Sequence, residues 1–110
     1  MSKIFYIDKT SRLEAMMTIS FRNKINWVEE GLSILSWNYS FVSDTELNDL
    51  KEVYSYFRKW KGNKLSKESG HCGISLGDII LLEDQAWMVV GAGFQKIPSV
   101  LFEKINIKNK

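Results

Sequence analysis

The pattern of apolar and polar residues predicts three strands outside the central hairpin, and one of them shows strict alternation. The segment from Lys3 to Asp8 is short, β-branched and aromatic, and a polar run follows it, so it predicts a first strand. Apolar and small polar residues alternate from Leu35 to Phe41, which is typical of a half-buried strand. Residues Val100 to Ile107 predict a last strand. Pro98 is expected at its entry or at a sheet edge, where no ladder N–H is needed.

The stretch from Ser75 to Ile97 predicts a β-hairpin at the centre of the fold. Its two apolar runs join at Glu83 to Gln85. Before the first run, Gly77-Asp78 predicts a turn in which the glycine supplies a permissive backbone dihedral and the aspartate bonds the nearby backbone. After the second run, Gly91 to Gly93 predicts a bulge or tight bend that turns Phe94 into the core.

Two segments in the first third of the chain predict helices. Ser11 and Glu14 have the spacing of a capping box, in which each side chain bonds a backbone N–H at the helix start. The expected core stripe at helical spacing is Leu13, Met16, Met17, Ser20 and Phe21. Asn26 and Glu29 repeat the capping spacing before a short second helix, which Gly31 weakens.

The clearest helix is predicted from Ser43 to Lys61. Ser43 and Glu46 form a third capping-box pair, and Gly62 ends the segment after a basic last turn. The expected core stripe is Leu47, Leu50, Val53, Tyr54, Phe57 and Trp60. Together these elements predict an α+β fold, with a mainly antiparallel sheet of four to five strands and two to three helices packed on one face.

Length and composition favour one folded domain over residues 1–110. The chain has 110 residues, of which 45% are hydrophobic and 25% charged, as in ordinary globular domains. Cys72 is the one cysteine, so no internal disulfide can form and a reducing, cytoplasmic setting is expected. The N-terminal apolar run is short and flanked by charges, so we expect neither a signal peptide nor a membrane span.

The charge balance excludes two simple functions. The net charge is +2, from 15 basic and 13 acidic residues. A protein that mimics DNA would be strongly acidic, and a protein that depends mainly on phosphate contacts is usually more basic.

The polar segment from Lys61 to Gly73 predicts a long loop, and connections of this length are often functional. With the end of the preceding helix it collects several bases beside aromatic residues. These are our candidate partner-binding residues: Arg58, Lys59, Trp60, Lys61, Lys64, Lys67 and His71. A solvated basic loop without a ligand is the alternative interpretation.

The residues that could carry chemistry are few. His71 and Cys72 are the single histidine and the single cysteine, and sequence neighbours in a loop rarely converge as a catalytic pair. With one histidine and one cysteine, the chain is also short of soft ligands for a zinc site. Gly91 to Gly93 is followed by Phe94 and not by a helix, so it does not predict a dinucleotide site. We therefore expect no catalytic residue, no metal and no cofactor.

The C-terminal third resembles a known group of small proteins. The run from Gly73 to Ile80, GISLGDII, followed by WMVV at 87–90 and GFQKI at 93–97, is similar to the tail of proteins from phages, plasmids and other mobile elements. YodL-type domains have a similar tail. The similarity covers about a quarter of the chain. It departs at Cys72 and Gly73, where that group tends to have arginine and then serine.

The resemblance implies an accessory protein of a phage or mobile element that binds and disables a protein of its bacterial host. We therefore expect a non-enzymatic partner of a host protein or ribonucleoprotein complex, of the anti-CRISPR or anti-restriction type. A nucleic-acid-binding module that uses the basic Arg58–Lys67 segment is the alternative, with Trp60 and Tyr56 for base stacking. An enzyme that uses Cys72 or His71 is a third alternative. A second copy of the chain is a further candidate partner.

Overall fold

The structure is a computed structural model that describes residues 1–20, 27, 34–58, 74, 76–91 and 93–108. This part of the chain has a mixed sheet of six strands and three helices, so the predicted α+β class is confirmed with more strands than expected. In chain order the elements are β1 (Ser2–Ile7), α1 (Lys9–Ser20), β2 (Asn38–Thr45), α3 (Leu50–Arg58), β3 (Ile79–Leu82), β4 (Gln85–Val90), β5 (Gly93–Ile97), α5 (Ser99–Lys104) and β6 (Asn106–Lys108).

The strands lie in the order β5-β4-β3-β1-β2-β6. β1 is in the middle and pairs antiparallel with both β2 and β3, whereas β6 pairs parallel with β2. The predicted hairpin is confirmed: β3 and β4 join through a two-residue turn at Glu83 and Asp84, and β5 then pairs antiparallel with β4.

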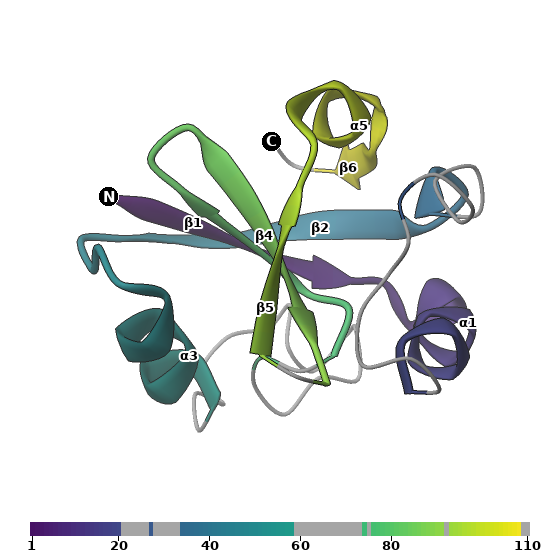
Figure 1. The fold of residues 1–110 in the computed structure, drawn as a ribbon, viewed down its shortest axis with the longest axis horizontal. Helices are drawn as coiled ribbons and strands as arrows, with labels where there is room; N and C mark the ends of the chain where they lie inside the picture. Colours follow the sequence, from purple (N-terminus) through teal and green to yellow (C-terminus); the bar gives the residue numbers. More distant parts are fainter. Residues whose placement is uncertain (21–26, 28–33, 59–73, 75, 92, 109–110) are drawn as a thin grey trace.

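The helices cover both faces of the sheet, so the prediction that they all pack on one face was wrong. Ile4 and Tyr6 of β1 lie in a core with α3, whereas Phe5 and Ile7 lie in a second core with α1 and the α5 segment. In Figure 1, β4 and β5 pass between α3 on the left and α1 on the right. Because the central strands are apolar on both sides, both faces require a cover.

Helix α1 begins earlier and faces the core differently than predicted. It begins at Lys9, and the Asp8 carbonyl accepts the N–H groups of Ser11 and Arg12 at 3.0 and 3.1 Å. Ser11 is therefore not a cap, and its hydroxyl accepts the Asn38 N–H at 3.0 Å.

The face of α1 that packs on the sheet carries the small Ala15 and the larger Ile19. Ala15 and Ile19 are fully buried, whereas Leu13 and Met17 of the predicted stripe are 71% and 57% exposed. Met16 is also exposed. The prediction failed because Ala15 allows α1 to approach Gly77 closely, although the other side of the helix carries more large apolar residues.

The third predicted capping box was also wrong. Ser43 lies inside β2, which runs on to Thr45 instead of ending at Phe41. Helix α3 begins at Leu50, where the Asp49 carboxylate accepts the Glu52 N–H at 3.3 Å. The predicted stripe is confirmed at Leu50, Val53, Tyr54 and Phe57, which all pack in the α3 core.

Residues 99–104 form a helix, so the predicted long last strand was wrong. Pro98 precedes α5 with φ −55°, and its carbonyl accepts the Phe102 N–H at 3.0 Å. Leu101, Phe102 and Ile105 pack against the α1 core, which is a helical spacing. Proline favours the start of a helix because its φ is already helical, and only the three-residue β6 follows.

Other predictions lie largely outside the described residues. Of the predicted second helix, Trp27 is helical and packs on the α1 core. The predicted loop from Lys61 to Gly73 lies entirely outside the described residues.

The turn before β3 joins four elements, and we call it the Gly77–Asp78 corner. Asp78 is fully buried, and its carboxylate accepts the Ile7 N–H of β1 at 2.9 Å. Its carbonyl accepts the Val89 N–H of β4 at 2.9 Å, and the Gly77 N–H donates to the Val89 carbonyl at 2.9 Å. The carboxylate therefore ties the corner to a distant strand, beyond the local turn bonding that the sequence predicts.

Gly77 has the permissive backbone that the sequence predicts, with φ +91°. An added Cβ would lie 3.3 Å from Ala15 Cβ, so glycine also allows α1 to approach. The Gly77 carbonyl accepts the Tyr39 hydroxyl of β2 at 2.7 Å. Burial raises the pKa of the Tyr39 phenol well above its ordinary value, and the nearby Asp78 carboxylate raises it further.

The new assignment of the α1 face predicts a contrast between two substitutions. Ile19→Ala should lower the free energy of unfolding by about 2–4 kcal/mol, because it leaves a cavity in the core. Met17→Ala should change it by less than about 0.5 kcal/mol, because the side chain is mostly exposed. Urea denaturation measures both. A larger loss of unfolding free energy for Met17→Ala than for Ile19→Ala would show that the predicted stripe, and not the face with Ile19, packs in the core.

The raised pKa of Tyr39 predicts loss of stability in alkali. The neutral phenol favours the folded state, so this contribution is complete below the unfolded pKa of about 10 and declines as pH rises toward the folded pKa. Tyr39→Phe should cost about 1 kcal/mol at neutral pH, because the bond to Gly77 is lost, and should weaken the decline above about pH 10. Urea denaturation across this range tests it, with Tyr56→Phe as the exposed control. Parallel declines in Tyr39→Phe and the native protein would contradict it.

Candidate functional site

The structure describes one of the seven candidate partner-binding residues. Arg58 is the last residue of α3 and is exposed. The other candidates lie outside the described residues, as does Cys72: Lys59, Trp60, Lys61, Lys64, Lys67 and His71. The geometry of a candidate site can therefore be built only around Arg58.

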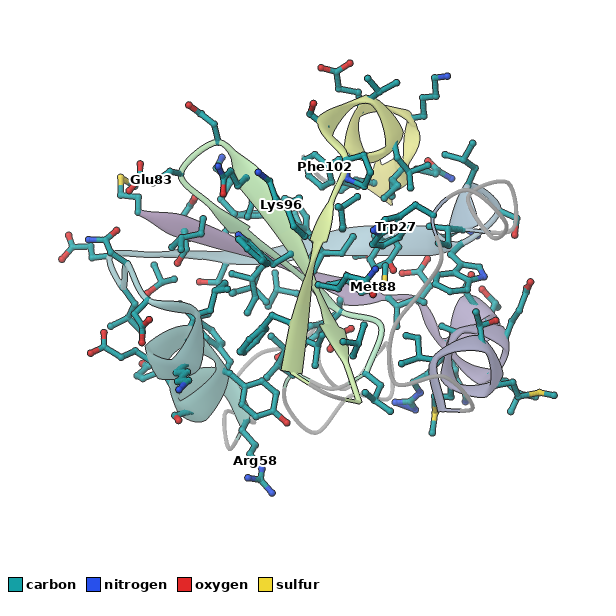
Figure 2. All side chains as sticks on the ribbon, viewed as in Figure 1. Trp27, Arg58, Glu83, Met88, Lys96 and Phe102 are labelled. Carbon is teal, nitrogen blue, oxygen red and sulfur yellow. The ribbon has the colours of Figure 1, made fainter. Side chains whose placement is uncertain are left out.

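Arg58 borders a hollow of about 500 Å³ between α3 and the β4–β5 turn, which we call the α3 groove. Its lining residues are Tyr54, Arg58, Ile74, Leu76, Val89, Val90, Gly91, Gly93 and Phe94. In Figure 2 Arg58 extends below α3, away from the sheet. The groove therefore has an apolar floor and a cation on its rim.

Tyr54 and Phe94 form the aromatic wall of the groove. Their rings meet edge to face, with centroids 5.9 Å apart and planes at 82°. Both side chains are half-buried, so each packs on the α3 core and keeps part of its surface in solvent. Such rings combine apolar area with few rotatable bonds, which suits a contact surface.

The β4–β5 turn places Phe94 beside α3. Val90 pairs with Gly93, so the connection is the tight bend that the sequence predicts, and Gly93 has φ +131°. No described residue outside its chain neighbours lies within 4 Å of the position of a Gly93 Cβ, so its backbone conformation and not crowding favours glycine. The bend lets Phe94 pack in the α3 core.

Two basic side chains of the described residues lie near this side of β5, and Asp84 lines the same hollow as one of them, Lys96. Among the described residues that line the groove, Arg58 is the one that is charged, and Lys96 of β5 is exposed. Figure 2 shows Lys96 on the half of β5 farther from Arg58. The ion pairs within the described part of the chain lie elsewhere, at Met1–Glu83 and Lys3–Asp44. The surface is therefore suited to an acidic group.

Two other hollows have a different character. One of about 330 Å³ lies between the end of β2 and α3, where Asp44 and Glu46 line it together with the exposed Tyr56. Another of about 500 Å³ lies between the β3–β4 turn and α5, where Lys96 and Asp84 line it together with Pro98 and Phe102. Neither combines a cation with paired aromatic rings.

A metal centre would require clustered donor side chains. Within the described ranges, no group of three or more His, Cys, Asp or Glu residues is placed to hold a metal ion. Among the helices that the structure describes, none has both the length and the apolar character that crossing a membrane requires.

Sequence reasoning assigned Tyr54 and Phe94 only to the core. Each lies on a predicted apolar stripe or turn, and the sequence does not reveal that β5 lies next to α3 on the same face of the sheet. Gly91 and Gly93 were the available signal for Phe94, because glycines in a strand pattern predict a bend, and a residue next to a bend keeps part of its side chain exposed.

Comparisons with known proteins gave no relative for this chain: no family model, no curated protein and no solved structure matches it.

The ring contact predicts an energetic coupling across the groove. In a double-mutant cycle of Tyr54→Leu and Phe94→Leu, the coupling energy should be about 0.5–1.5 kcal/mol. Each single substitution already removes the edge-to-face contact, so the double variant should lose less stability than the sum of the two single losses. Urea denaturation of the four proteins measures it. A cycle of Tyr56→Leu with Phe94→Leu is the control and should give a value near zero, since Tyr56 instead contacts Phe57. Equal values in the two cycles would contradict the prediction.

Proposed function

We propose that this chain is a non-enzymatic protein-binding domain that contacts its partner through the α3 groove. The observation that carries the proposal is the combination of Tyr54, Phe94 and Arg58 at one open hollow. Aromatic residues and arginine are the types most enriched in the centres of protein interfaces. A half-buried aromatic wall is already ordered before binding, so little entropy is lost when a partner packs on it.

The charge of the groove favours a protein partner over nucleic acid. A nucleic-acid interface gains its affinity from several phosphate contacts, each of which needs a base. Among its described lining residues the α3 groove has one, Arg58, and the whole chain has a net charge of +2. The predicted basic segment up to Lys67 would be needed for phosphate binding, so nucleic acid remains the alternative outcome of the experiment below.

The biological setting of the partner is proposed from the sequence resemblance of residues 73–97. On that basis the partner is a host protein or ribonucleoprotein complex that takes part in bacterial defence, met in the cytoplasm of the host. Support for this setting comes from the resemblance alone, whereas the groove geometry supports protein binding in general.

The test is an affinity capture from bacterial lysate with nuclease treatment and a wash at moderate salt. The tagged native chain should retain a stoichiometric protein, and Arg58→Glu should lose it, because the substitution reverses the charge on the groove rim. Lys51→Glu is the matched control, since Lys51 is exposed on α3 and does not line the groove. It should retain the partner.

The outcomes separate the alternatives. A retained protein that both variants lose equally would point to general electrostatic attraction and contradict the groove assignment. Material that disappears on nuclease treatment would support the nucleic-acid module. In that case charge reversal at Lys61, Lys64 and Lys67 should abolish its retention, with a steep dependence on salt.

A further inference from the structure

The outer side of β5 carries backbone groups without a strand partner in the described sheet. β5 is the terminal strand of the order β5-β4-β3-β1-β2-β6, so the sheet pairs it on one side, with β4. In Figure 1 it runs through the centre of the view, in front of the other strands. Such an edge is a template for an added strand.

The hydrogen bonds of Val89 show which backbone groups of β5 point outward. Val89 donates to the Asp78 carbonyl and accepts from the Gly77 N–H, both at 2.9 Å and both on the side away from β5. Its partner across the ladder is Phe94, so this pair is of the non-hydrogen-bonded kind. The N–H and C=O of Phe94 therefore point away from β4, to the outer edge of the described sheet. With a repeat of two residues, those of Lys96 do so too.

The two-residue alternation along β5 also determines the face of the sheet on which an added strand would place its side chains. Phe94 packs with Val89 in the α3 core, and Lys96 lies two residues further along β5 on the same face. Residues directly opposite Phe94 and Lys96 on an added antiparallel strand would project to this face. The first would lie beside Phe94, which forms the wall of the α3 groove with Tyr54. The second would lie beside the Lys96 ammonium group.

We propose that the edge of β5 binds an extended acidic segment of the partner protein, with the pattern acid-x-apolar-x-acid. One acid pairs with Lys96, the apolar residue packs on Phe94, and the other acid reaches Arg58 beyond the Gly93 end of the strand. The pattern reads the same in both directions, so it fits a parallel or an antiparallel strand. This inference rests on the proposed function and names the partner chemistry of the same groove.

The charges argue for a separate partner and against a second copy of this chain. In a pairing of two β5 edges, the segment Gly93–Ile97 would bring a second Lys96 and no acid to the contact. Like charges directly opposite each other on neighbouring strands are destabilising, which applies to the register that pairs Lys96 with Lys96. An acidic strand satisfies both cations, Lys96 and Arg58, and adds backbone hydrogen bonds to Phe94 and Lys96.

The test uses a synthetic peptide with the centre Asp-Thr-Leu-Thr-Asp, flanked by serine and glycine, and measures amide hydrogen exchange. In the free protein the amides of Phe94 and Lys96 should exchange fast and that of Gln95, which points to β4, slowly. The peptide should slow exchange at Phe94 and Lys96 by about tenfold or more at saturation. A scrambled peptide of the same composition is the control and should leave both rates unchanged. Slow exchange at both amides before any peptide is added would overturn the proposal.

Two variants of Lys96 separate the backbone from the charge. Lys96→Ala removes the ammonium group and should weaken peptide binding by about two- to fivefold. Lys96→Pro also removes the outward N–H, without loss of a ladder bond to β4, and should weaken it about fivefold further. Equal affinities in the two variants would contradict strand addition. Circular dichroism checks that both variants fold.

Modification of the peptide backbone tests whether the peptide forms ladder hydrogen bonds with β5. N-methylation of every second peptide amide should abolish binding when it falls on the amides that face β5, and should be tolerated on the intervening ones. Equal effects of the two methylation patterns would overturn strand addition.

Lys96→Glu should weaken binding about five- to tenfold, and a peptide with lysine in place of the aspartate that faces residue 96 should recover the loss.

The results distinguish this proposal from the proposed function. If Arg58→Glu loses the captured partner and Lys96→Pro keeps it, the α3 groove binds protein and strand addition is wrong. If the peptide slows exchange at Phe94 and Lys96 but neither substitution affects the captured partner, the edge binds acidic strands and the function assigned to the groove is wrong. Sedimentation that shows a dimer broken by Lys96→Pro would replace the acidic partner by a second copy.

Discussion

The Gly77–Asp78 corner is the constraint on which the rest of the sheet depends. A buried carboxylate needs hydrogen-bond donors, and Asp78 obtains one from the Ile7 N–H in the central strand. The Asp78 carbonyl and the Gly77 N–H hold Val89 of β4, and the Gly77 carbonyl holds the Tyr39 hydroxyl of β2. A single turn thereby fixes the relative positions of three strands, and the missing Cβ of Gly77 admits α1 beside them.

The corner also determines the candidate site, although it lies in the interior. Because Val89 uses both backbone groups on Gly77 and Asp78, its neighbour Phe94 must direct its own backbone groups outward. The same alternation places the Phe94 ring on the α3 side, where it meets Tyr54. The direction of the edge and the wall of the groove therefore follow from one set of hydrogen bonds, so a shift of one residue in register would abolish both.

The sequence predicted local features well and long-range choices poorly. The hairpin, the first strand and the apolar stripe of α3 follow from periodicity, which is a local property. The core face of α1 does not, because Ala15 was preferred over Leu13 for its small size beside Gly77, and that neighbour is distant in sequence. The capping spacing at Ser43 failed for a similar reason: pairing with β1 extends β2 through that residue. Arg58 was predicted as a partner-binding residue, but its aromatic neighbours depend on the strand order.

The two edges of the sheet differ in a way that bears on association. β6 has three residues and offers little backbone to another strand, whereas β5 has five and is followed at once by Pro98. Edge strands that carry an exposed lysine resist pairing with their own kind, because two copies would bring like charges together. Lys96 would discourage self-association of β5, and the same charge would favour an acidic strand. The charge of Lys96 thus opposes pairing of β5 with a second β5 and favours pairing with an acidic strand, so it makes the edge selective for a partner of opposite charge.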